Sequence, residues 1–142
     1  MAVLDAEVLV PILSCDLVLC AFDHDRYRPV VSGCILGEVE RTLASGFALL
    51  DPAAIGRRAF QVAQTLALHT HPAAPVTKAV AVVNVKDRHV AAVALAAAAD
   101  VVVSNDRRLR RHVDRLGPLL RAVSGDELMV GLYDADHDGT DR

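Results

Sequence analysis

Four acidic side chains occur where the sequence pattern predicts that a strand ends or that the next helix begins: Asp5, Glu38, Asp87 and Asp106. Carboxylates that lie close together repel one another unless a cation joins them, and carboxylate oxygens are good ligands for Mg²⁺ and related ions. A divalent ion bound in this way can activate water and neutralise charge on a phosphate. If the four residues meet in space, the sequence predicts metal-assisted chemistry on a phosphate.

The elements around these residues predict how they could meet. Apolar runs at 2–4, 28–31 and 101–104 are typical of buried strands, and stretches with helical spacing of apolar residues follow them. Strands that alternate with helices predict a three-layer α/β/α sandwich with a mainly parallel sheet and right-handed crossovers. In such a sheet, helices begin at the carboxyl edge of the strands, where ligands bind. The predicted topology therefore brings all four acidic residues to one edge.

The rest of the chain supplies further elements. Pro11 marks a bend or a first turn in the helical stretch after Asp5. Ser32 and Gly33 form a plausible cap for the next helix, and Asp51-Pro52 is a good helix start. His69-Thr70-His71 could be a metal pair but has no nearby third ligand, so a solvated turn is the preferred interpretation. The remaining predicted elements are a short strand at 80–83, an alanine-rich helix at 88–98, a final strand at 121–123 and a short helix at 125–132. We expect one domain over residues 1–132 and a polar acidic tail over 133–142.

Composition limits the function classes. The chain has 142 residues, is 53% hydrophobic and carries a net charge of −3, which fits one domain that is not broadly basic. Aromatic residues make up 4%, so a base-stacking platform is not expected. The three cysteines lack metal-ligand spacing and lie in apolar stretches, as buried thiols in a reducing cytoplasm do. No apolar run reaches the roughly 18 residues of a membrane span, and no leader precedes the first strand, so we expect a cytoplasmic protein without a membrane partner.

Each acidic residue also has a simpler explanation. An aspartate at a helix start is most often a cap, worth about 1 kcal/mol. Spacing cannot separate Glu38 from Glu40, because the two flank opposite sides of the apolar stripe of their helix. Only the coincidence of four acidic residues at one edge favours a shared site over separate caps.

Four segments then resemble the acidic motifs of PIN-domain ribonucleases. They are Val-Leu-Asp-Ala-Glu-Val-Leu-Val-Pro at 3–11, Ser-Gly-Cys-Ile-Leu-Gly-Glu-Val at 32–39, Lys-Asp-Arg-His-Val-Ala-Ala at 86–92 and Val-Val-Ser-Asn-Asp at 102–106. Each motif alone is weak, but the four in order are fairly specific and cover residues 2 to about 130. The match to the second motif selects Glu38 over Glu40. VapC-type toxins of bacterial and archaeal toxin–antitoxin pairs dominate this family.

The resemblance implies a site, a cofactor and a reaction. Asp5, Glu38, Asp87 and Asp106 would hold Mg²⁺ or Mn²⁺. Ser104 matches the small hydroxyl residue that often precedes the last acidic position by two, and Asn105 could coordinate weakly beside Asp106. The implied activity is an endoribonuclease in which a metal-activated water hydrolyses RNA, leaving 5′-phosphate and 3′-hydroxyl ends. A homodimer and an antitoxin whose C-terminal segment occludes the pocket are also implied.

An arginine cluster follows Asp106 directly: Arg107, Arg108, Arg110, Arg111 and Arg115. It is either a solvated helix face or a contact for the RNA backbone, and we expect Arg107, Arg108 and Arg111 to bind RNA. The alternative function is a non-cleaving PIN-like module that binds RNA or protein. A receiver domain is disfavoured because no acidic residue adjoins Asp5, and dinucleotide binding because no G-x-G-x-x-G follows a strand.

Overall fold

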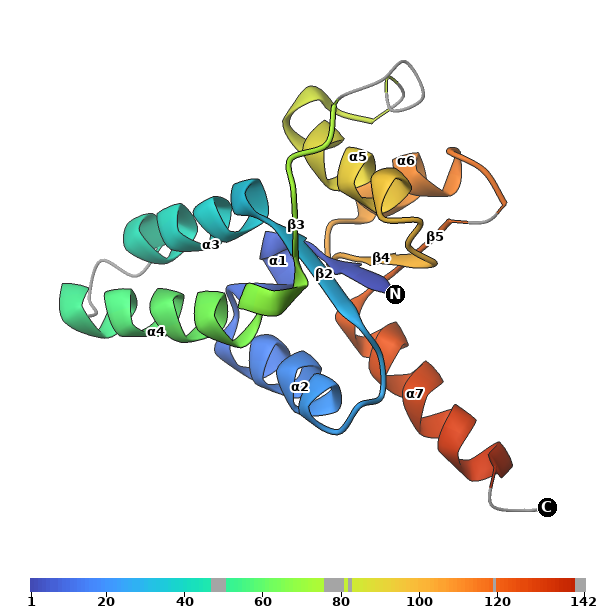
Figure 1. Ribbon diagram of the computed structural model, residues 1–142, viewed down its shortest axis with the longest axis horizontal. Helices are drawn as coiled ribbons and strands as arrows, with labels where there is room; N and C mark the ends of the chain where they lie inside the picture. Colours follow the sequence, from blue (N-terminus) through green and yellow to red (C-terminus); the bar gives the residue numbers. More distant parts are fainter. Residues whose placement is uncertain (47–50, 76–80, 82, 119, 140–142) are drawn as a thin grey trace.

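A five-stranded parallel sheet forms the centre of the computed structural model, which describes residues 1–46, 51–75, 81, 83–118 and 120–139 (Figure 1). The strands lie in the order β3-β2-β1-β4-β5, and every pair is parallel. Their bounds are β1 (Ala2–Leu4), β2 (Pro29–Ser32), β3 (Thr70–His71), β4 (Val101–Val103) and β5 (Arg121–Val123).

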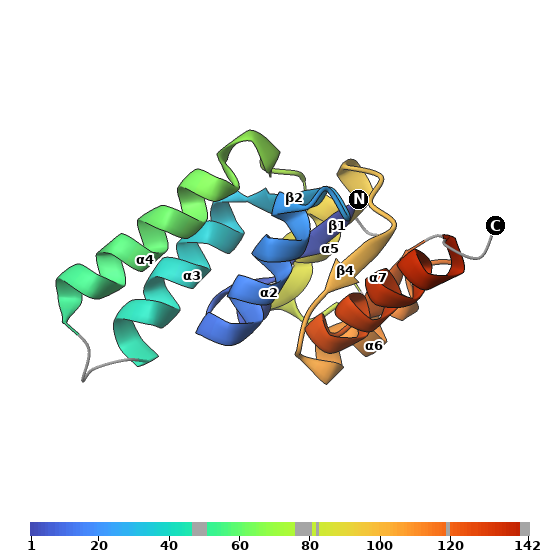
Figure 2. The same ribbon diagram turned by 90° about the horizontal axis from the view of Figure 1, so that it is seen from below.

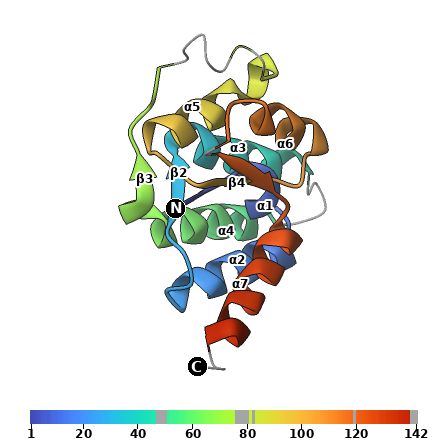
Figure 3. The same cartoon turned by 90° about the vertical axis from the view of Figure 1, so that its right-hand side faces the viewer.

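Helices cover both faces of this sheet. α5 and α6 lie on one face and α2 and α7 on the other, while α3 and α4 pack together as a pair that projects to the side (Figures 1–3). The helices are α1 (Ala6–Leu9), α2 (Ile12–Asp23), α3 (Gly33–Gly46), α4 (Pro52–Thr65), α5 (Arg88–Ala96), α6 (Arg107–Asp114) and α7 (Gly125–Gly139), with 3₁₀ turns η1 (Ala67–His69) and η3 (Val85–Asp87). The predicted α/β/α sandwich is confirmed.

The central strands are short and are buried on both faces. Every residue of β1, β2 and β4 is buried, and the apolar runs of β1 and β4 contain no polar residue. Such runs are typical of parallel strands covered by helices on both sides. α5 supplies one of these covers, because Val90, Ala91 and Val93 are buried against the sheet.

The order of the strands creates a switch point between β1 and β4. The chain proceeds from β1 to β2 and β3 on one side, and returns to place β4 and β5 on the other. Leu4 pairs with Val103 at the carboxyl ends of these neighbours. Residues that directly follow the two strands therefore emerge side by side, in the crevice where open α/β sheets bind ligands.

Several predicted helix starts are confirmed. Pro11 separates α1 from α2 and precedes the first residue of α2. The Ser32 hydroxyl accepts a hydrogen bond from the Ile35 amide at 3.2 Å, so it caps α3. The Asp51 carboxylate accepts from the Ala53 amide at 3.1 Å, with Pro52 in the first turn of α4. Local chemistry fixes where these helices begin.

The solvated turn predicted at His69-Thr70-His71 is wrong for its last two residues, which form a strand. Thr70 and His71 form the edge strand β3, in which Thr70 pairs with Val31 and His71 with Ser32. A strand of two residues shows no alternation of polar and apolar side chains, so its backbone pairing left no sequence signal. Of the short strand predicted at 80–83, residues 80 and 82 lie outside the described residues, and Ala81 and Val83 form a turn and a bend.

The end of the last helix also differs from the prediction. The helix expected to stop at Leu132 continues to Gly139, so the segment expected to be a polar tail is helical up to that residue. Arg26, in the turn before β2, explains the extension, since it forms an ion pair with Asp136 and donates to the Leu132 carbonyl at 3.2 Å. The alanine-rich helix, in contrast, ends at Ala96, before the positive φ of Ala98.

Two further expectations concern the cysteines and the membrane. All three cysteines are free, but only Cys15 is buried, and Cys20 and Cys34 are exposed, contrary to the expectation of buried thiols. No helix in the described part of the chain combines the length and the apolar character needed to cross a membrane.

Candidate active site

The four predicted acidic residues line one pocket of ≈ 380 Å³ at the carboxyl edge of the sheet. Asp5 follows β1, Glu38 lies on α3, Asp87 ends η3 and Asp106 precedes α6. The rest of the lining comes from Ala6, Glu7, Val10, Pro11, Arg41, Thr42 and Lys86. The expected convergence of the acidic residues therefore exists in the structure.

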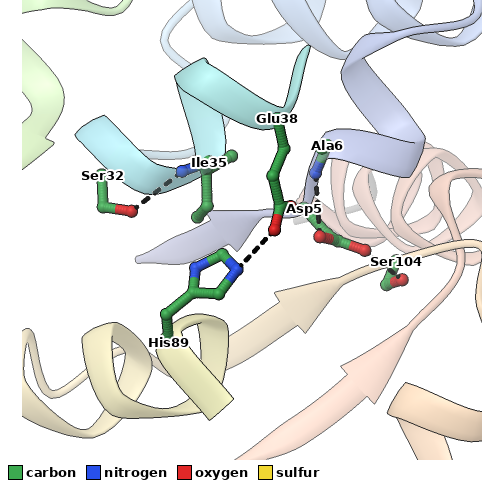
Figure 4. Close-up of polar contacts among 7 residues, drawn as sticks. All are labelled: Asp5, Ala6, Ser32, Ile35, Glu38, His89 and Ser104. Atoms are coloured by element: carbon green, nitrogen blue, oxygen red, sulfur yellow. Dashed lines mark hydrogen bonds and ion pairs between the residues drawn. The ribbon is translucent and has the colours of Figure 1, made fainter. Parts of the chain in front are cut away.

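Asp5 is the most deeply held carboxylate of the pocket. Its amide donates to the Val103 carbonyl at 3.0 Å, which continues the pairing of β1 with β4 by one residue. Its Oδ1 accepts from the Ala6 amide at 2.9 Å, and its Oδ2 accepts from the Ser104 hydroxyl at 2.7 Å (Figure 4). The residue is only 4% exposed. Asp5 is thus fixed by the sheet itself.

Burial raises the pKa of Asp5 to about 6 from its ordinary value of 3.8. The hydrogen bonds from Ser104 and Ala6 oppose this shift, whereas the nearby charges of Asp87 and Glu38 add to it. A buried carboxyl beside other carboxylates is costly to ionise, and a neighbouring cation would remove that cost.

Ser104 connects Asp5 to the fourth acidic residue. Its hydroxyl donates to Asp5 and accepts from the Asp106 amide at 3.1 Å, and the residue is fully buried. Asp106 also caps α6, because its Oδ1 accepts from the amides of Arg108 at 2.8 Å and Leu109 at 3.4 Å. Arg110, on α6, also holds this segment, because its side chain donates to the Ser104 carbonyl at 2.7 Å. The simple cap explanation is therefore correct for Oδ1 of Asp106.

Glu38 is held by a different kind of contact. Its Oε1 accepts a hydrogen bond from Nε2 of His89, on α5, at 2.8 Å (Figure 4). The side chain of Glu38 is 31% exposed and that of His89 is 21% exposed. Two helices that come from distant parts of the chain therefore meet through one polar pair beside the pocket.

Asp87 has no comparable anchor. Although it immediately precedes α5, its side chain makes no capping hydrogen bond. Partial burial raises its pKa; the charge of Lys86 opposes this, and the charges of Asp106 and Glu38 add to it. If Asp87 served only as a helix cap, its side chain would make a stabilising hydrogen bond. Within the described residues it makes none.

The donor chemistry of the pocket fits a divalent cation. Four carboxylates surround one space, and burial together with their mutual charge raises the pKa of Asp5 and Asp87. In the described part of the chain, however, no three acidic, histidine or cysteine side chains lie close enough together to share an ion. For three or more of them to ligate one ion directly, these side chains must move toward one another, whereas Mg²⁺ is commonly held by one or two carboxylates together with water.

The other predicted site residues lie outside the pocket. Asn105 accepts from the Gly125 amide at 3.1 Å and so ties the end of β4 to the start of α7. Arg107, Arg108 and Arg111 are exposed on α6. None of the four lines the pocket as the structure describes it.

Sequence reasoning missed three side chains near the carboxylates. His89 touches Glu38, and Arg41 and Lys86 line the pocket as exposed cations. Lys86 and His89 flank Asp87 within the third motif, and Arg41 lies one helical turn after Glu38, so position relative to the acidic residues was the available signal. Within the described part of the chain, neither Arg41 nor Lys86 forms an ion pair.

Comparison with known proteins agrees with this architecture. The family model of the PIN domain matches residues 1–108. The crystal structure of PAE2754 from Pyrobaculum aerophilum is similar with a TM-score of 0.69 at 20% identity, covering 94% of this chain and 96% of that one. The structure of FitAB bound to an IR36 DNA fragment is similar with a TM-score of 0.58 at 16% identity, covering 88% of this chain and 95% of that one. Among curated proteins, none matches this sequence.

Proposed function

The chain belongs to the PIN domain family, and from that premise we propose that it is a metal-dependent endoribonuclease that hydrolyses RNA phosphodiester bonds. PIN domains are typically metal-dependent nucleases. The observation that carries the proposal is the meeting of Asp5, Glu38, Asp87 and Asp106 around one pocket at the switch point of the sheet. The carboxyl edge is also where this class of fold binds its ligands.

The proposed cofactor is Mg²⁺ or Mn²⁺, held by these carboxylates. When bound, such an ion lowers the pKa of a water molecule and neutralises charge that develops on the phosphate. The sheet presents Asp5 and Asp106 from the ends of adjacent strands, and the helices present Glu38 and Asp87 from across the pocket. Ser104 keeps the first pair in place through its two hydrogen bonds.

Two pocket cations supply the means to bind the nucleic acid. Arg41 and Lys86 are exposed, line the same pocket as the carboxylates and form no ion pair with another described residue. An arginine fork suits bidentate contact with a phosphate, and a lysine acts as a point charge. Arg107, Arg108 and Arg111 would extend this contact along α6, which begins beside Asp106.

The biological role that we propose is the toxin of a type II toxin–antitoxin pair, of the VapC type. The proposal includes a homodimer and an antitoxin whose C-terminal segment covers the pocket. Its support is the set of four motifs, which resembles those of the toxin-rich ribonucleases. A small open reading frame beside the gene, encoding a DNA-binding head, would support this role, and co-purification of its product would test it.

Cleavage of nucleic acid by the purified chain tests the activity. We expect cleavage of structured RNA in Mn²⁺ or Mg²⁺, no cleavage after chelation and strongly reduced cleavage by Asp87→Asn. The panel should include transfer RNA, ribosomal RNA and DNA, because the similar FitAB structure contains a DNA fragment. If the metal-loaded, partner-free protein leaves every RNA intact but still binds RNA, the non-cleaving module is the better description.

A further inference from the structure

His89 makes the one polar contact described for the side chain of Glu38. Its Nε2 lies 2.8 Å from Oε1 of Glu38, which is a strong hydrogen bond to a charged acceptor (Figure 4). Because a carboxylate only accepts, the proton of this bond lies on Nε2. Glu38 lines the pocket and His89 does not, so the histidine supports the carboxylate from outside the pocket.

The second ring nitrogen shows that this histidine is not there for packing alone. Nδ1 of His89 is buried and has no hydrogen-bond partner among the described residues. A buried polar atom without a partner costs stability, so an apolar side chain of similar size would serve the packing of α5 better. The contact with Glu38 is what remains to explain a histidine at this position.

Ser104 and Asp5 form a parallel arrangement across the pocket. Ser104 also lies outside the pocket lining and donates to one oxygen of an acidic residue that lines it. In both pairs a side-chain donor occupies one carboxylate oxygen, and the other oxygen of Asp5 also accepts, from the Ala6 amide. For Glu38, the other oxygen makes no hydrogen bond within the described part of the chain, and it is the atom left for a ligand.

We propose that His89 is a positioning residue for Glu38, an inference that rests on the proposed metal-dependent function. A glutamate side chain has several rotatable bonds, and restricting it in advance lowers the entropy lost when it takes a ligand. His89 restricts it through Oε1 and leaves Oε2 for a divalent cation. Donors of this kind behind a metal ligand typically contribute 10- to 100-fold to metal affinity or activity.

Manganese titration of the metal-free full chain tests this role. Calorimetry should show that His89→Leu weakens Mn²⁺ binding by about 10- to 100-fold, whereas His89→Gln, whose amide can still donate, recovers part of the loss. His112→Leu is the matched control, because His112 is also partly buried, also has a buried Nδ1 without a partner in the described structure, and does not line the pocket. We expect wild-type affinity for this control.

The same titration in a Glu38→Gln background shows whether His89 acts through Glu38. Once the carboxylate is gone, adding His89→Leu should change Mn²⁺ affinity by less than about 2-fold, because coupled residues are not additive. A further loss as large as in the wild-type background would overturn the proposal, and so would wild-type affinity in His89→Leu alone. If the wild type itself binds no Mn²⁺, the proposed function fails together with this inference; if only His89→Leu is unaffected, this inference alone fails.

Discussion

The two halves of the acidic pocket are built in different ways. On one side, Asp5 and Asp106 follow adjacent strands, and backbone pairing and the Ser104 hydroxyl lock them together. On the other side, Glu38 and Asp87 come from helical segments. Among the described residues, they are joined to the fold near the pocket only by the His89 contact and by their own backbones. Hydrogen bonds within the fold fix the strand half, whereas the helix half depends more on side-chain positions.

This difference distinguishes carboxylates that stabilise the fold from a carboxylate that does not. In the strand half the carboxylates also serve the fold, since Asp106 caps α6 and Asp5 accepts two hydrogen bonds. In the helix half Asp87 has no stabilising side-chain hydrogen bond among the described residues, and its raised pKa means that ionisation is unfavourable there. A carboxylate that costs stability and caps nothing is better explained by a ligand.

The largest effect should come from Asp87→Asn. We expect RNA cleavage to fall by at least about 100-fold, because loss of a ligand should cost no less than loss of a residue behind a ligand. The metal-free variant should unfold at the wild-type temperature or above. The change removes a negative charge that neighbouring carboxylates repel and that makes no capping hydrogen bond. Cleavage rates and calorimetric unfolding check the two halves of this prediction. Marked destabilisation of the metal-free variant would return Asp87 to a purely structural role.

The next effect is the pH dependence that Asp5 gives to stability. Its folded pKa of about 6 lies above the ordinary 3.8, so the folded state binds the proton more tightly than the unfolded state does. This contribution is fully present below pH 4 and is lost as the pH rises through 6, by about 3 kcal/mol in all. Denaturant unfolding of metal-free wild type and Asp5→Asn between pH 4 and 7 measures it. An equal slope in both proteins would contradict the assignment to Asp5.

A smaller effect is expected for Ser104→Ala in the strand half. The change removes the donor to Asp5 and the acceptor of the Asp106 amide, and both groups are at least partly buried. We expect a loss of about 1–3 kcal/mol of unfolding free energy, because hydrogen-bond partners are left unsatisfied. Ser124→Ala is the control: this hydroxyl is the acceptor of an exposed hydrogen bond from the Glu127 amide. An equal loss of unfolding free energy in the two variants would mean that the hydroxyl between Asp5 and Asp106 stabilises the fold no more than an exposed one does.

The smallest effect concerns the cations. If Arg41 and Lys86 bind phosphates, each change to glutamine should weaken RNA binding and reduce the slope of log K against log salt by about 1. The triple change of Arg107, Arg108 and Arg111 provides the comparison, since these side chains are exposed on α6 and do not line the pocket. If the salt dependence changes only in the triple variant, the phosphates contact α6 and not the pocket.

The strand half is also the part that the sequence predicts well. Buried apolar runs predict β1 and β4. Because these strands are neighbours, the positions of Asp5, Ser104 and Asp106 follow from the backbone register. The helix half is harder, because spacing alone could not choose Glu38 over Glu40, and only the family resemblance did. His89 gave no separate signal, since its role depends on how α3 and α5 meet in three dimensions.

Other errors share that cause. β3 consists of two residues whose strand character comes from pairing with β2, and α7 extends beyond Leu132, where Arg26 of a distant turn holds it. In both cases a tertiary contact decides a local structure. Starts of helices such as α3 and α4, whose caps are set by adjacent residues, were predicted correctly.

The central claim is that the carboxylates form one metal site and are not merely a set of helix caps. The most direct test is the thermal unfolding of wild type and Asp5→Asn with increasing Mn²⁺. Asparagine keeps the shape of Asp5 and its acceptor for the Ala6 amide, so the metal-free variant should be at least as stable as wild type near neutral pH. Wild type should gain stability with Mn²⁺ because the ion binds the folded state, and Asp5→Asn should gain none. A variant that still shows the full manganese shift would remove Asp5 from the site and contradict the account.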